Sequence, residues 1–591
     1  MIKLFYNMIY MVKLSNKYST SAIYNHVKLK NKGFLSTDLV ISNLQVNQDI
    51  IFNNTKLILD TKSASSKGIN IKYNTLDPDN DIYNFAFEGL IPFTKSISSA
   101  YKHTLLVTNT CGVLSCGKNF DGKLGNGSNN DIYVANPQYI KSTGIRDYLG
   151  NLDNNSYNGR NCISVSSGLQ HSAILLNNGK VLTFGQNKRS QLGHGNSKDY
   201  DSGDPSGIKH ENLKNYLGNS DSDSYDGYNA ISISCGQRHN LVLLNNGKVL
   251  SFGRNDYGQL GHGTVIDYSS GDPSGVKDEN LKDANNIIDN KSYNSTNAIQ
   301  ISTEYNHSAI LLKSGKVITF GDNTNGQLGH GKIGYRTGDP SGVIDGSGYD
   351  GTNAVSVSCG SFHTAILLNT GKVLTFGAAG SLGHGPGKSG YSSGDPSGVF
   401  DASGYNGTNA VKVSCGTNHT AILLDTGKVI TFGKNEYGQL GHGTVEDYCS
   451  TDPSGVIDAS GYNGSNAVDV ECGSFNTFIL LKNGNVVSFG RSTDRQLGLG
   501  NDYSYSSGDP SGINTTDFSN NCMTVSKYTI NTNFNLDKKF LYGITSDFSQ
   551  KEVSKQLYNY KRRLIFDNSN ISVHATLPMN NSYFKLIGKS K

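Results

Sequence analysis

Residues 354–377 have the sequence AVSVSCGSFHTAILLNTGKVLTFG, and this phrase, recurring along the 591-residue chain, decides the fold. Close copies are AVKVSCGTNHTAILLDTGKVITFG at 410–433 and AISISCGQRHNLVLLNNGKVLSFG at 230–253. Related copies begin near Thr94, Cys162, Ala298 and Ala467. A period of this length predicts a propeller or a solenoid, in which each unit needs its neighbours to bury its faces.

Each unit has the pattern of antiparallel strands. Residues 355–357 alternate between apolar and polar, and residues 365–368 form a wholly apolar run, as expected for a strand covered on both faces. The turn at 369–371, which is Asn-Gly in other copies, predicts a hairpin because these residues tolerate positive φ. Repeated small sheets favour a closed ring with few open edges. We expect an all-β fold: a seven-bladed β-propeller of four-stranded antiparallel blades, with short N- and C-terminal extensions.

Two glycine-containing segments follow each hairpin. The first is Gly-Gln-Leu-Gly-His-Gly, as at 258–263. The second is Gly-Asp-Pro-Ser-Gly, which occurs at 203–207, 271–275, 338–342, 394–398 and 508–512. Because Asp-Pro opens turns and glycine completes them, the second segment is predicted to be a turn.

These phrases together resemble the regulator-of-chromosome-condensation repeat, with its CG-x-x-HT strand, apolar strand, GKV-x-x-FG and N-x-x-GQLGHG. The resemblance covers about 94–543. Where that family often has Trp before the glycine that ends the hairpin, six copies here have Phe, which preserves a large core ring. The family implies a ring closed by strands from both termini, so we expect 523–543, a decayed eighth copy, to complete it with 82–92.

The predicted domains follow the repeats and the charge. Residues 1–75 form a basic N-terminal extension, either a small β appendage or partly disordered, and residues 546–591 form a basic C-terminal tail. Residues 76–545 form the propeller, with repeats starting near 94, 162, 230, 298, 354, 410 and 467 and a partial copy at 523. The basic ends are either solvated flanks or contacts for nucleic acid.

Histidines recur in two series, after the first strand and in the glycine loop. The first is His103, His171, His239, His307, His363 and His419; the second is His194, His262, His330, His384 and His442. Equivalent positions in different blades are spread around a ring and cannot converge on one metal ion. We therefore expect hydrogen bonding within or between blades, and no metal.

No sequence motif indicates covalent chemistry. The chain has no Gly-x-Ser-x-Gly elbow before a triad, no Gly-Lys-Ser/Thr phosphate loop and no βαβ unit around its Gly-x-Gly patterns. We expect no catalytic residue, no cofactor and no enzyme, with exchange activity on a small GTPase as the open exception.

The first three units are longer than the later ones, and the extra length always lies before the next repeat. Three adjacent blades should therefore project long loops from one side of the ring, where binding sites usually lie. The predicted binding residues are Arg146, Asp147, Tyr148, Leu149, Lys214, Asn215, Tyr216, Leu217, Lys282 and Asp283. The alternative is a duplicated long unit with no selected role.

The resemblance implies two functions from different classes. The family's founding member is a guanine-nucleotide exchange factor for the Ran-type GTPase, and other members are ubiquitin-ligase modules, cilium-associated scaffolds and a plant ultraviolet-B photoreceptor. The chain has no Trp for a photoreceptor, and residues 546–591 are too short for a HECT-like domain. We expect a protein-interaction scaffold that binds a partner protein on the long loops. The alternative is an exchange factor for a Ran-like small GTPase, associated with chromatin.

The compartment follows from the cysteines and the apolar runs. Nine cysteines are too few and too regularly placed for a disulfide scaffold, and no stretch has transmembrane length. The start lacks a signal-peptide core and cleavage site. We expect a monomer in the cytoplasm or nucleus that does not bind membranes.

Overall fold

The structure is a computed structural model. It describes residues 94–513 apart from 109–110, 196–200, 267–268, 279–292, 386–391, 447–448, 483–484 and 501–505, and the backbone of ten short strands outside that range. The chain divides into two compact units, Met1–Ile91 with Met523–Lys591, and Pro92–Cys522.

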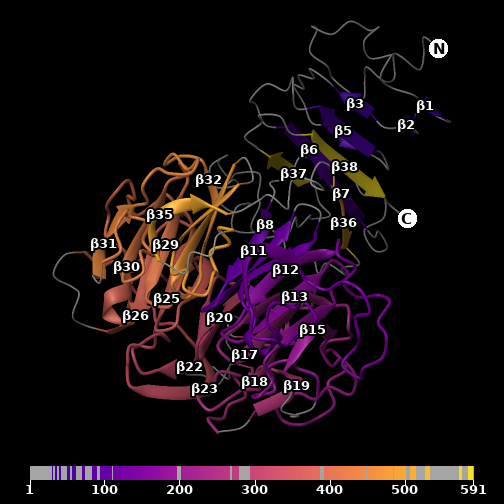
Figure 1. The fold of residues 1–591 in the computed structure, drawn as a ribbon, viewed down its shortest axis with the longest axis horizontal. Helices are drawn as coiled ribbons and strands as arrows, with labels where there is room; N and C mark the ends of the chain where they lie inside the picture. Colours follow the sequence, from indigo (N-terminus) through magenta and orange to yellow (C-terminus); the bar gives the residue numbers. More distant parts are fainter. Residues whose placement is uncertain are drawn as a thin grey trace, which may run out of the picture. The chain divides into compact units, whose positions relative to one another are not determined.

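The second unit contains seven four-stranded antiparallel sheets, each made of four consecutive strands (Figure 1). The first strands are β8 (Thr94–Ser99), β12 (Cys162–Ser167), β16 (Ala230–Cys235), β20 (Ala298–Glu304), β24 (Ala354–Cys359), β28 (Ala410–Cys415) and β32 (Ala467–Cys472). The second strands are β9 (His103–Thr108), β13 (His171–Leu176), β17 (His239–Leu244), β21 (His307–Leu312), β25 (His363–Leu368), β29 (His419–Leu424) and β33 (Asn476–Leu481). The third strands are β10 (Val113–Lys118), β14 (Val181–Gly185), β18 (Val249–Arg254), β22 (Val317–Asn323), β26 (Val373–Gly377), β30 (Val429–Lys434) and β34 (Val486–Gly490). The fourth strands are β11 (Tyr133–Tyr139), β15 (Ser202–Gly207), β19 (Ser269–Gly275), β23 (Tyr335–Gly342), β27 (Ser393–Gly398), β31 (Cys449–Gly455) and β35 (Ser507–Gly512).

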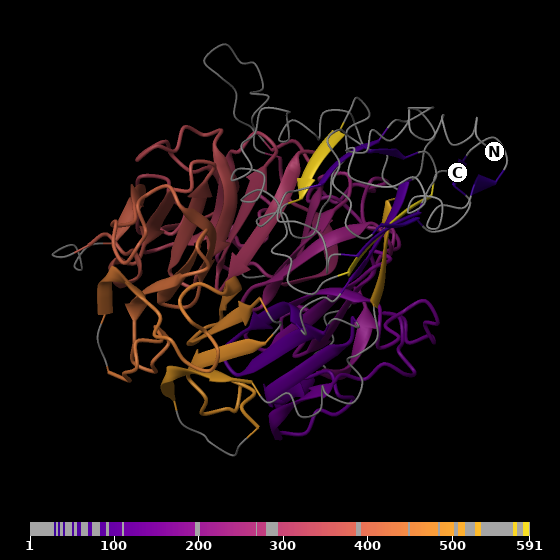
Figure 2. The ribbon, with the colours of Figure 1, turned by 90° about the horizontal axis from the view of Figure 1, so that it is seen from above.

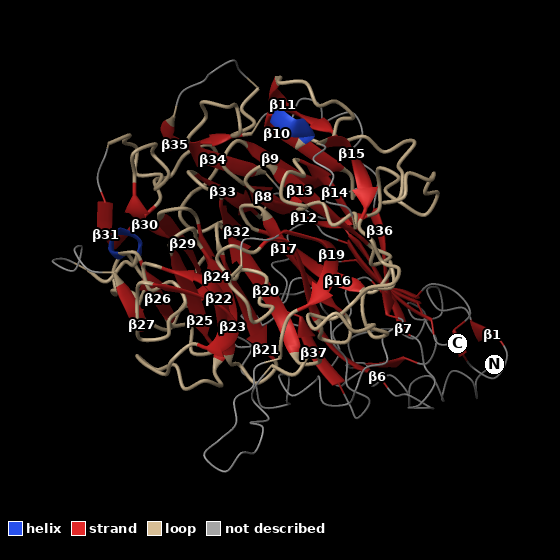
Figure 3. Cartoon of the chain, turned by 90° about the horizontal axis from the view of Figure 1, so that it is seen from below, coloured by secondary structure: helices blue, strands red, loops and turns tan. Residues whose placement is uncertain are grey.

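The sheets are the blades of a ring, which confirms the predicted seven-bladed propeller. Each first strand contacts the first strand of the next blade, and β32 contacts β8, so the ring closes (Figure 2). The predicted repeat starts coincide with the beginnings of these first strands. Strands dominate the described residues, where helix is confined to two 3₁₀ turns, η1 (Phe120–Gly122) and η2 (Ala379–Ser381) (Figure 3).

The hydrophobic core lies between the blades. One cluster joins residues of blades 2 and 3, including Ala173 and Phe252, and similar clusters join other neighbouring blades. The predicted core ring is confirmed, because all six phenylalanines before the hairpin-ending glycine are fully buried: Phe184, Phe252, Phe320, Phe376, Phe432 and Phe489. The glycine loop of one blade packs on the phenylalanine of the next. A Cβ on Gly193, whose φ is +69°, would lie 2.8 Å from Phe252 Cε2.

The prediction that Gly-Asp-Pro-Ser-Gly forms turns is wrong, because these segments lie in the fourth, outermost strands. An outermost strand tolerates proline, since one side of its backbone needs no partner in the sheet. The pairing is irregular here: in blade 2 the register shifts between Thr183 and Gly185, next to the segment. The proline therefore marks the edge of each blade and not a break between strands.

The predicted hairpins between second and third strands are confirmed, but the residues of their turns that have positive φ differ from the prediction. In blade 2, the Leu175–Val181 pair is followed by a bond from the Leu176 N–H to the Lys180 carbonyl at 2.9 Å. Only Gly179 of the Asn-Gly pair has positive φ, at +82°. A Cβ on Gly179 would lie 1.8 Å from the carbonyl oxygen of Tyr228, so glycine is required there.

The hypothesis that 523–543 and 82–92 complete the ring is also wrong. Their backbones do pair, as β36 (Ser526–Thr532) with β7 (Tyr83–Gly89), but this pair belongs to a five-stranded sheet of the first unit. The seventh blade takes its fourth strand, β35, from its own repeat and needs no strand from the N-terminus.

The first unit contains further short strands, in sheets ordered β3-β5-β38-β7-β36, β37-β6-β4 and β1-β2. They are β1 (Leu29–Lys30), β2 (Phe34–Leu35), β3 (Leu39–Ile41), β4 (Ile50–Phe52), β5 (Lys56–Asp60), β6 (Ile69–Tyr73), β37 (Ile571–Ala575) and β38 (Tyr583–Lys589). None of the helices in the described part of the chain has the length and hydropathy of a membrane span.

Candidate interaction surface on the long-loop face

The antiparallel order of the blades gives the ring two different faces. The loops from a fourth strand to the next first strand lie on one face with the second-to-third hairpin turns; we call it the long-loop face. The first-to-second turns and the glycine loops lie on the other, which we call the turn face. The two long loops that the structure describes, 140–161 and 208–229, are therefore on the same face, as predicted.

Both described long loops contain the same small hairpin. In the first, the Asp153 N–H donates to the Ile145 carbonyl at 2.9 Å and the Asp147 N–H to the Asn151 carbonyl at 2.8 Å. In the second, the matching bonds are Asp221 to Leu213 at 3.1 Å and Asn215 to Asn219 at 2.9 Å. The two loops thus have the same backbone pairing on adjacent blades.

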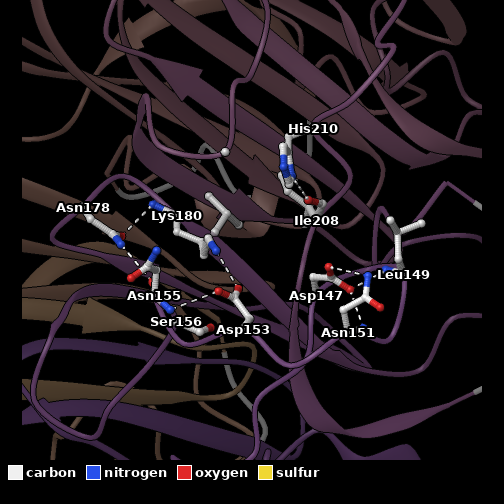
Figure 4. A network of polar contacts seen from close by, with 12 residues as sticks. Asp147, Leu149, Asn151, Asp153, Asn155, Ser156, Asn178, Lys180, Ile208 and His210 are labelled. Atoms are coloured by element: carbon white, nitrogen blue, oxygen red, sulfur yellow. Dashed lines mark hydrogen bonds and ion pairs between the residues drawn. The ribbon is translucent and has the colours of Figure 1, made fainter.

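A side-chain oxygen organises each tip, and Figure 4 shows the first of the two. The Asp147 carboxylate accepts the N–H groups of Leu149 at 2.9 Å and Asn151 at 2.8 Å. Slight burial alone would raise the pKa of Asp147, but these N–H donors and the Asn151 amide lower it below the usual value. In the second loop, the Asn215 amide oxygen accepts the N–H groups of Leu217 and Asn219 at 3.0 and 3.1 Å. Aspartate and asparagine favour such turns because their side chains bond the backbone two residues on.

The base of each hairpin is fixed by buried contacts. Ile145 and Leu213 are buried in the cores between blades. Lys180, directly before β14, pairs with Asp153 at 2.5 Å, and their side chains are only 8% and 9% exposed (Figure 4). Lys248 pairs with Asp221 in the next blade. Each hairpin is therefore held at one end by a buried aliphatic residue, at the other by an ion pair, and between these ends by its backbone hydrogen bonds. A loop held in this way loses less conformational entropy when a partner binds.

The tips present apolar side chains to solvent. Leu149 and Leu217, at matching positions, are 63% and 67% exposed, and Leu152 is 63% exposed. The Tyr148 ring packs edge-on against His210 at 5.3 Å between centroids. Partial burial and the nearby Glu211 carboxylate raise the pKa of Tyr148 to about 12, so the phenol stays protonated at neutral pH.

The other predicted binding residues lie in the same hairpins. Arg146 donates to the carbonyl of Gly150 at 2.6 Å, so it supports the tip from within. Lys214 is exposed, and Tyr216 is half-buried. Lys282 and Asp283, in the third long loop, lie outside the described residues.

The first histidine series bridges neighbouring blades, which confirms its predicted structural role. Each imidazole Nε2 contacts the side chain one position after the equivalent residue of the next blade, as in His239 to Ser308 at 3.0 Å. The same contact occurs at His103, His171, His307, His363 and His419. The glycine-loop histidines instead contact a hydroxyl of their own blade, as in His262 to Ser251 at 2.8 Å.

One repeated tyrosine was not predicted. The Tyr225 hydroxyl accepts the N–H of Val181 at 2.9 Å, at the start of the third strand of the preceding blade. Equivalent bonds are made by Tyr157, Tyr293, Tyr349, Tyr405 and Tyr462. The signal in the sequence is the recurring Ser/Gly-Tyr-Asn/Asp segment about five residues before each first strand. Within the described ranges, no three His, Cys, Asp or Glu side chains gather as a metal site.

Family profiles match two parts of the propeller. The profile of the RCC1-like domain matches residues 210–536, and that of the regulator of chromosome condensation (RCC1) repeat matches residues 162–191. The first match covers more than half of the chain.

Individual relatives share the propeller. The chain is 29% identical over 335 residues to the probable E3 ubiquitin-protein ligase HERC6 of Homo sapiens, covering 56% of this chain but only 29% of that protein. It is 27% identical over 391 residues to the ultraviolet-B receptor UVR8 of Arabidopsis thaliana, covering 58% of this chain and 79% of the receptor. Prp20p of Saccharomyces cerevisiae has the same fold, with a TM-score of 0.52 and 16% identity over 78% of this chain and 90% of Prp20p. The chain belongs to the RCC1-like domain family.

Proposed function

We propose that this chain is a protein-interaction scaffold that binds a partner protein through the long-loop face. The observation that carries the proposal is the pair of matching hairpins, each fixed at its base and topped by a solvent-exposed leucine, Leu149 or Leu217. A single exposed leucine is ordinary on a protein surface. Two at equivalent positions on rigid loops of adjacent blades form a repeated, preorganised apolar contact.

The chemistry of the tips fits a protein partner. Burying an exposed leucine removes apolar surface from water, and tyrosine is enriched among the residues that contribute most to binding in protein interfaces. Leu149 and Leu217 supply the apolar part, and Tyr148 and Tyr216 add amphipathic rings beside them. We place this function in the cytoplasm or nucleus, with the chain acting as a monomer. The free, buried thiols at the ends of the first strands, including Cys235 and Cys359, support a reducing compartment.

The alternative, nucleotide exchange on a Ran-like small GTPase, rests on family membership alone. Prp20p binds Gsp1p and histones, whereas HERC6 is named as a ubiquitin ligase and UVR8 as a light receptor. Relatives with such different roles share one propeller, so the fold does not choose among them. We favour the scaffold because the matching hairpins of the described long loops present exposed apolar side chains, Leu149 and Leu217, that suit contact with a protein surface.

Affinity capture with the full chain tests the proposal. Wild-type protein and the double variant L149S/L217S are used as bait in nuclease-treated extract, with and without GTP, and bound proteins are identified by mass spectrometry. The matched control is I266S/I333S, which removes two aliphatic side chains of comparable exposure, 58% and 54%, from loops of the turn face. We expect specific partners to be lost with L149S/L217S and kept with I266S/I333S.

Two results would contradict the scaffold proposal. Equal capture by wild-type protein and L149S/L217S would show that the long-loop tips are not the binding site. A small GTPase captured only without nucleotide, together with faster release of fluorescent GDP from that GTPase, would establish the exchange-factor alternative.

A further inference from the structure

A repeated ion pair joins the outer edges of blades 1 to 4. In each case a lysine two residues after the fourth strand pairs with the aspartate before the proline in the next blade's fourth strand. The distances from Nζ to Oδ1 are 2.8 Å for Lys141–Asp204, 2.9 Å for Lys209–Asp272 and 2.5 Å for Lys277–Asp339. The edge of the ring therefore accommodates an ammonium group beside this carboxylate.

Blades 4 to 6 have apolar residues at the position of the lysine. Ile344, Phe400 and Ile457 also lie two residues after their fourth strands, and they are 37%, 44% and 36% exposed. The aspartates of the blades that follow them are kept, as Asp395, Asp452 and Asp509. Among the residues that the structure describes, none of these three carboxylates lies within ion-pair distance of a cationic side chain.

The apolar side chain takes the place of the lysine stem and stays next to the carboxylate. In blade 3, a Cβ on the last glycine of the glycine loop would lie 2.9 Å from Lys277 Cδ and 3.3 Å from Asp339 Oδ1. In blade 4, a Cβ on the equivalent glycine would lie 3.1 Å from Ile344 Cδ1 and 3.4 Å from Asp395 Oδ1. The two arrangements thus differ in the cation and share the carboxylate.

The other two blades repeat this arrangement with one variation. In blade 6, a Cβ on the equivalent glycine would lie 3.3 Å from Ile457 Cδ1 and 3.5 Å from Asp509 Oδ1. In blade 5 it would lie 2.9 Å from Phe400 Cδ2, and Asp452 is half-buried. The outer two positions therefore offer an exposed carboxylate beside an isoleucine, and the middle one offers an exposed aromatic ring.

We propose that the outer edge of blades 4 to 6 is a second docking surface, apart from the long-loop tips, for a segment of a partner protein in which lysine or arginine stands beside apolar residues. A basic side chain of the partner takes the position that the lysine holds in blades 1 to 3 and pairs with Asp395 or Asp509. Its apolar neighbours cover Ile344, Phe400 and Ile457.

The charge of the propeller suits such a partner. Residues 94–513 contain 31 Lys and Arg against 36 Asp and Glu, so the ring attracts a cationic segment and repels nucleic acid. The exposed apolar side chains favour a protein over a simple polyamine, because covering them removes apolar surface from water. Blades 1 to 3 do not offer the same contact, since their lysines already pair with the carboxylates.

The test uses the full chain and a short fluorescein-labelled peptide of alternating lysine and leucine, measured by fluorescence anisotropy at physiological ionic strength. D395N/D509N removes the two exposed carboxylates, and we expect it to bind the peptide about tenfold more weakly, as for the loss of two exposed ion pairs. I344K/I457K should weaken binding to a similar extent, because the introduced ammonium groups can pair with the same carboxylates.

The matched control is D204N/D339N. It changes the same position of the repeat and alters the net charge by the same amount as the two test variants, but its carboxylates are already paired. We expect it to bind the peptide like wild type, and L149S/L217S should also do so because the long-loop tips are a separate site. Thermal unfolding of all four variants checks that they fold.

Photocrosslinking of the wild-type chain provides a measurement that does not depend on a variant. A benzophenone in the same peptide should crosslink to residues 343–345, 399–401 or 456–458. Equal binding by D395N/D509N and D204N/D339N, loss of binding in L149S/L217S, or crosslinks confined to other segments would overturn the proposal. Self-association of the wild-type chain that I344K/I457K abolishes would replace the partner segment with a second copy of the chain.

Discussion

Single hydrogen-bonding side chains connect the blades at the residue scale. The Ser308 hydroxyl donates to the carbonyl of Gln259 at 3.0 Å, so it must accept from Nε2 of His239, which fixes the neutral tautomer of that ring. Nδ1 of His239 then has no partner, and burial lowers the pKa of this histidine to about 3. The preceding Gly236 leaves room for the ring, since a Cβ there would lie 2.3 Å from His239 Cε1.

The buried tyrosines satisfy a different backbone group. Tyr225 is fully enclosed, and burial raises its pKa above the usual value, so its hydroxyl is neutral. It accepts from Val181 and donates to the carbonyl of Gly227 at 3.0 Å. The role could not be predicted from the repeat phrase, because 44 residues separate the tyrosine from Val181 and only the folded chain brings them together.

Replacing this tyrosine by phenylalanine should destabilise the propeller. Y225F leaves the Val181 N–H buried without an acceptor, which costs roughly 1–3 kcal/mol. The free energy of unfolding, measured in urea, should fall by that amount. Y216F, at the half-buried loop tyrosine, is the control and should change it by less than about 0.5 kcal/mol. Equal effects of the two variants would show that the hydroxyl of Tyr225 contributes nothing specific.

At the scale of elements, some strands are specified by local sequence patterns and others by their position in the folded blade. The central hairpins could be predicted because alternation, apolar runs and the Asn-Gly turn all act within a few residues. The fourth strands could not, because the Asp-Pro of 203–207 has the composition of a turn. Its strand conformation comes from pairing with β14 and from the free outer edge of the blade.

The glycine loops should be intolerant of a side chain for reasons of packing as well as backbone conformation. Gly193 and Gly218 both have positive φ, at +69° and +85°, but only at Gly193 would a Cβ meet Phe252. Left-handed strain costs about 1–2 kcal/mol for alanine at either position. G193A should lose roughly 1–3 kcal/mol more than G218A from overpacking. Urea unfolding measures the difference in free energy of unfolding between the two variants. Identical decreases would show that packing against Phe252 contributes nothing.

The long-loop hairpins depend on their buried ion pairs. D153N removes the partner of Lys180 where both side chains are almost fully enclosed, and breaking a buried pair costs about 3–5 kcal/mol. D204N breaks the exposed Lys141–Asp204 pair, worth about 0–1 kcal/mol. Amide hydrogen exchange should rise across 145–153 in D153N and stay unchanged in D204N. The side of the ring that carries these loops was predictable from the sequence repeats. The ion pair was not predictable, because 27 residues separate Asp153 from Lys180.

At the scale of the whole molecule, the ring is closed by side chains and core packing. Ser99 of the first blade donates to Asn476 of the seventh at 3.1 Å, and Thr104 donates to the carbonyl of Gln496 at 2.7 Å. Leu106 and Phe478 join one hydrophobic cluster across the same seam. The repeats predicted a ring, but not this closure, because the pairs lie almost 400 residues apart and are specified only once all seven blades have formed.

The histidine bridges make the whole ring sensitive to acid. Burial lowers the pKa of His171 to about 4 and those of His239, His307, His363 and His419 to about 3. In the unfolded chain these groups take up protons near pH 6.5. Between about pH 6.5 and 4 the unfolded state therefore binds more protons, and the free energy of unfolding falls as the pH is lowered. Above pH 6.5 these histidines are neutral in both the folded and the unfolded chain, so they no longer lower the free energy of unfolding.

The variant H239N/H307N should weaken this dependence, because asparagine already fills the equivalent position at Asn476 and does not titrate. Removing two protonation sites should reduce the slope of unfolding free energy against pH by up to about 2.7 kcal/mol per pH unit between pH 4 and 6. H210N, which changes a loop histidine that makes no bridge between blades, is the control. Urea unfolding at several pH values measures the slopes. An unchanged slope in H239N/H307N would mean that acid acts elsewhere, for example on the glycine-loop histidines, such as His262 with its pKa near 4.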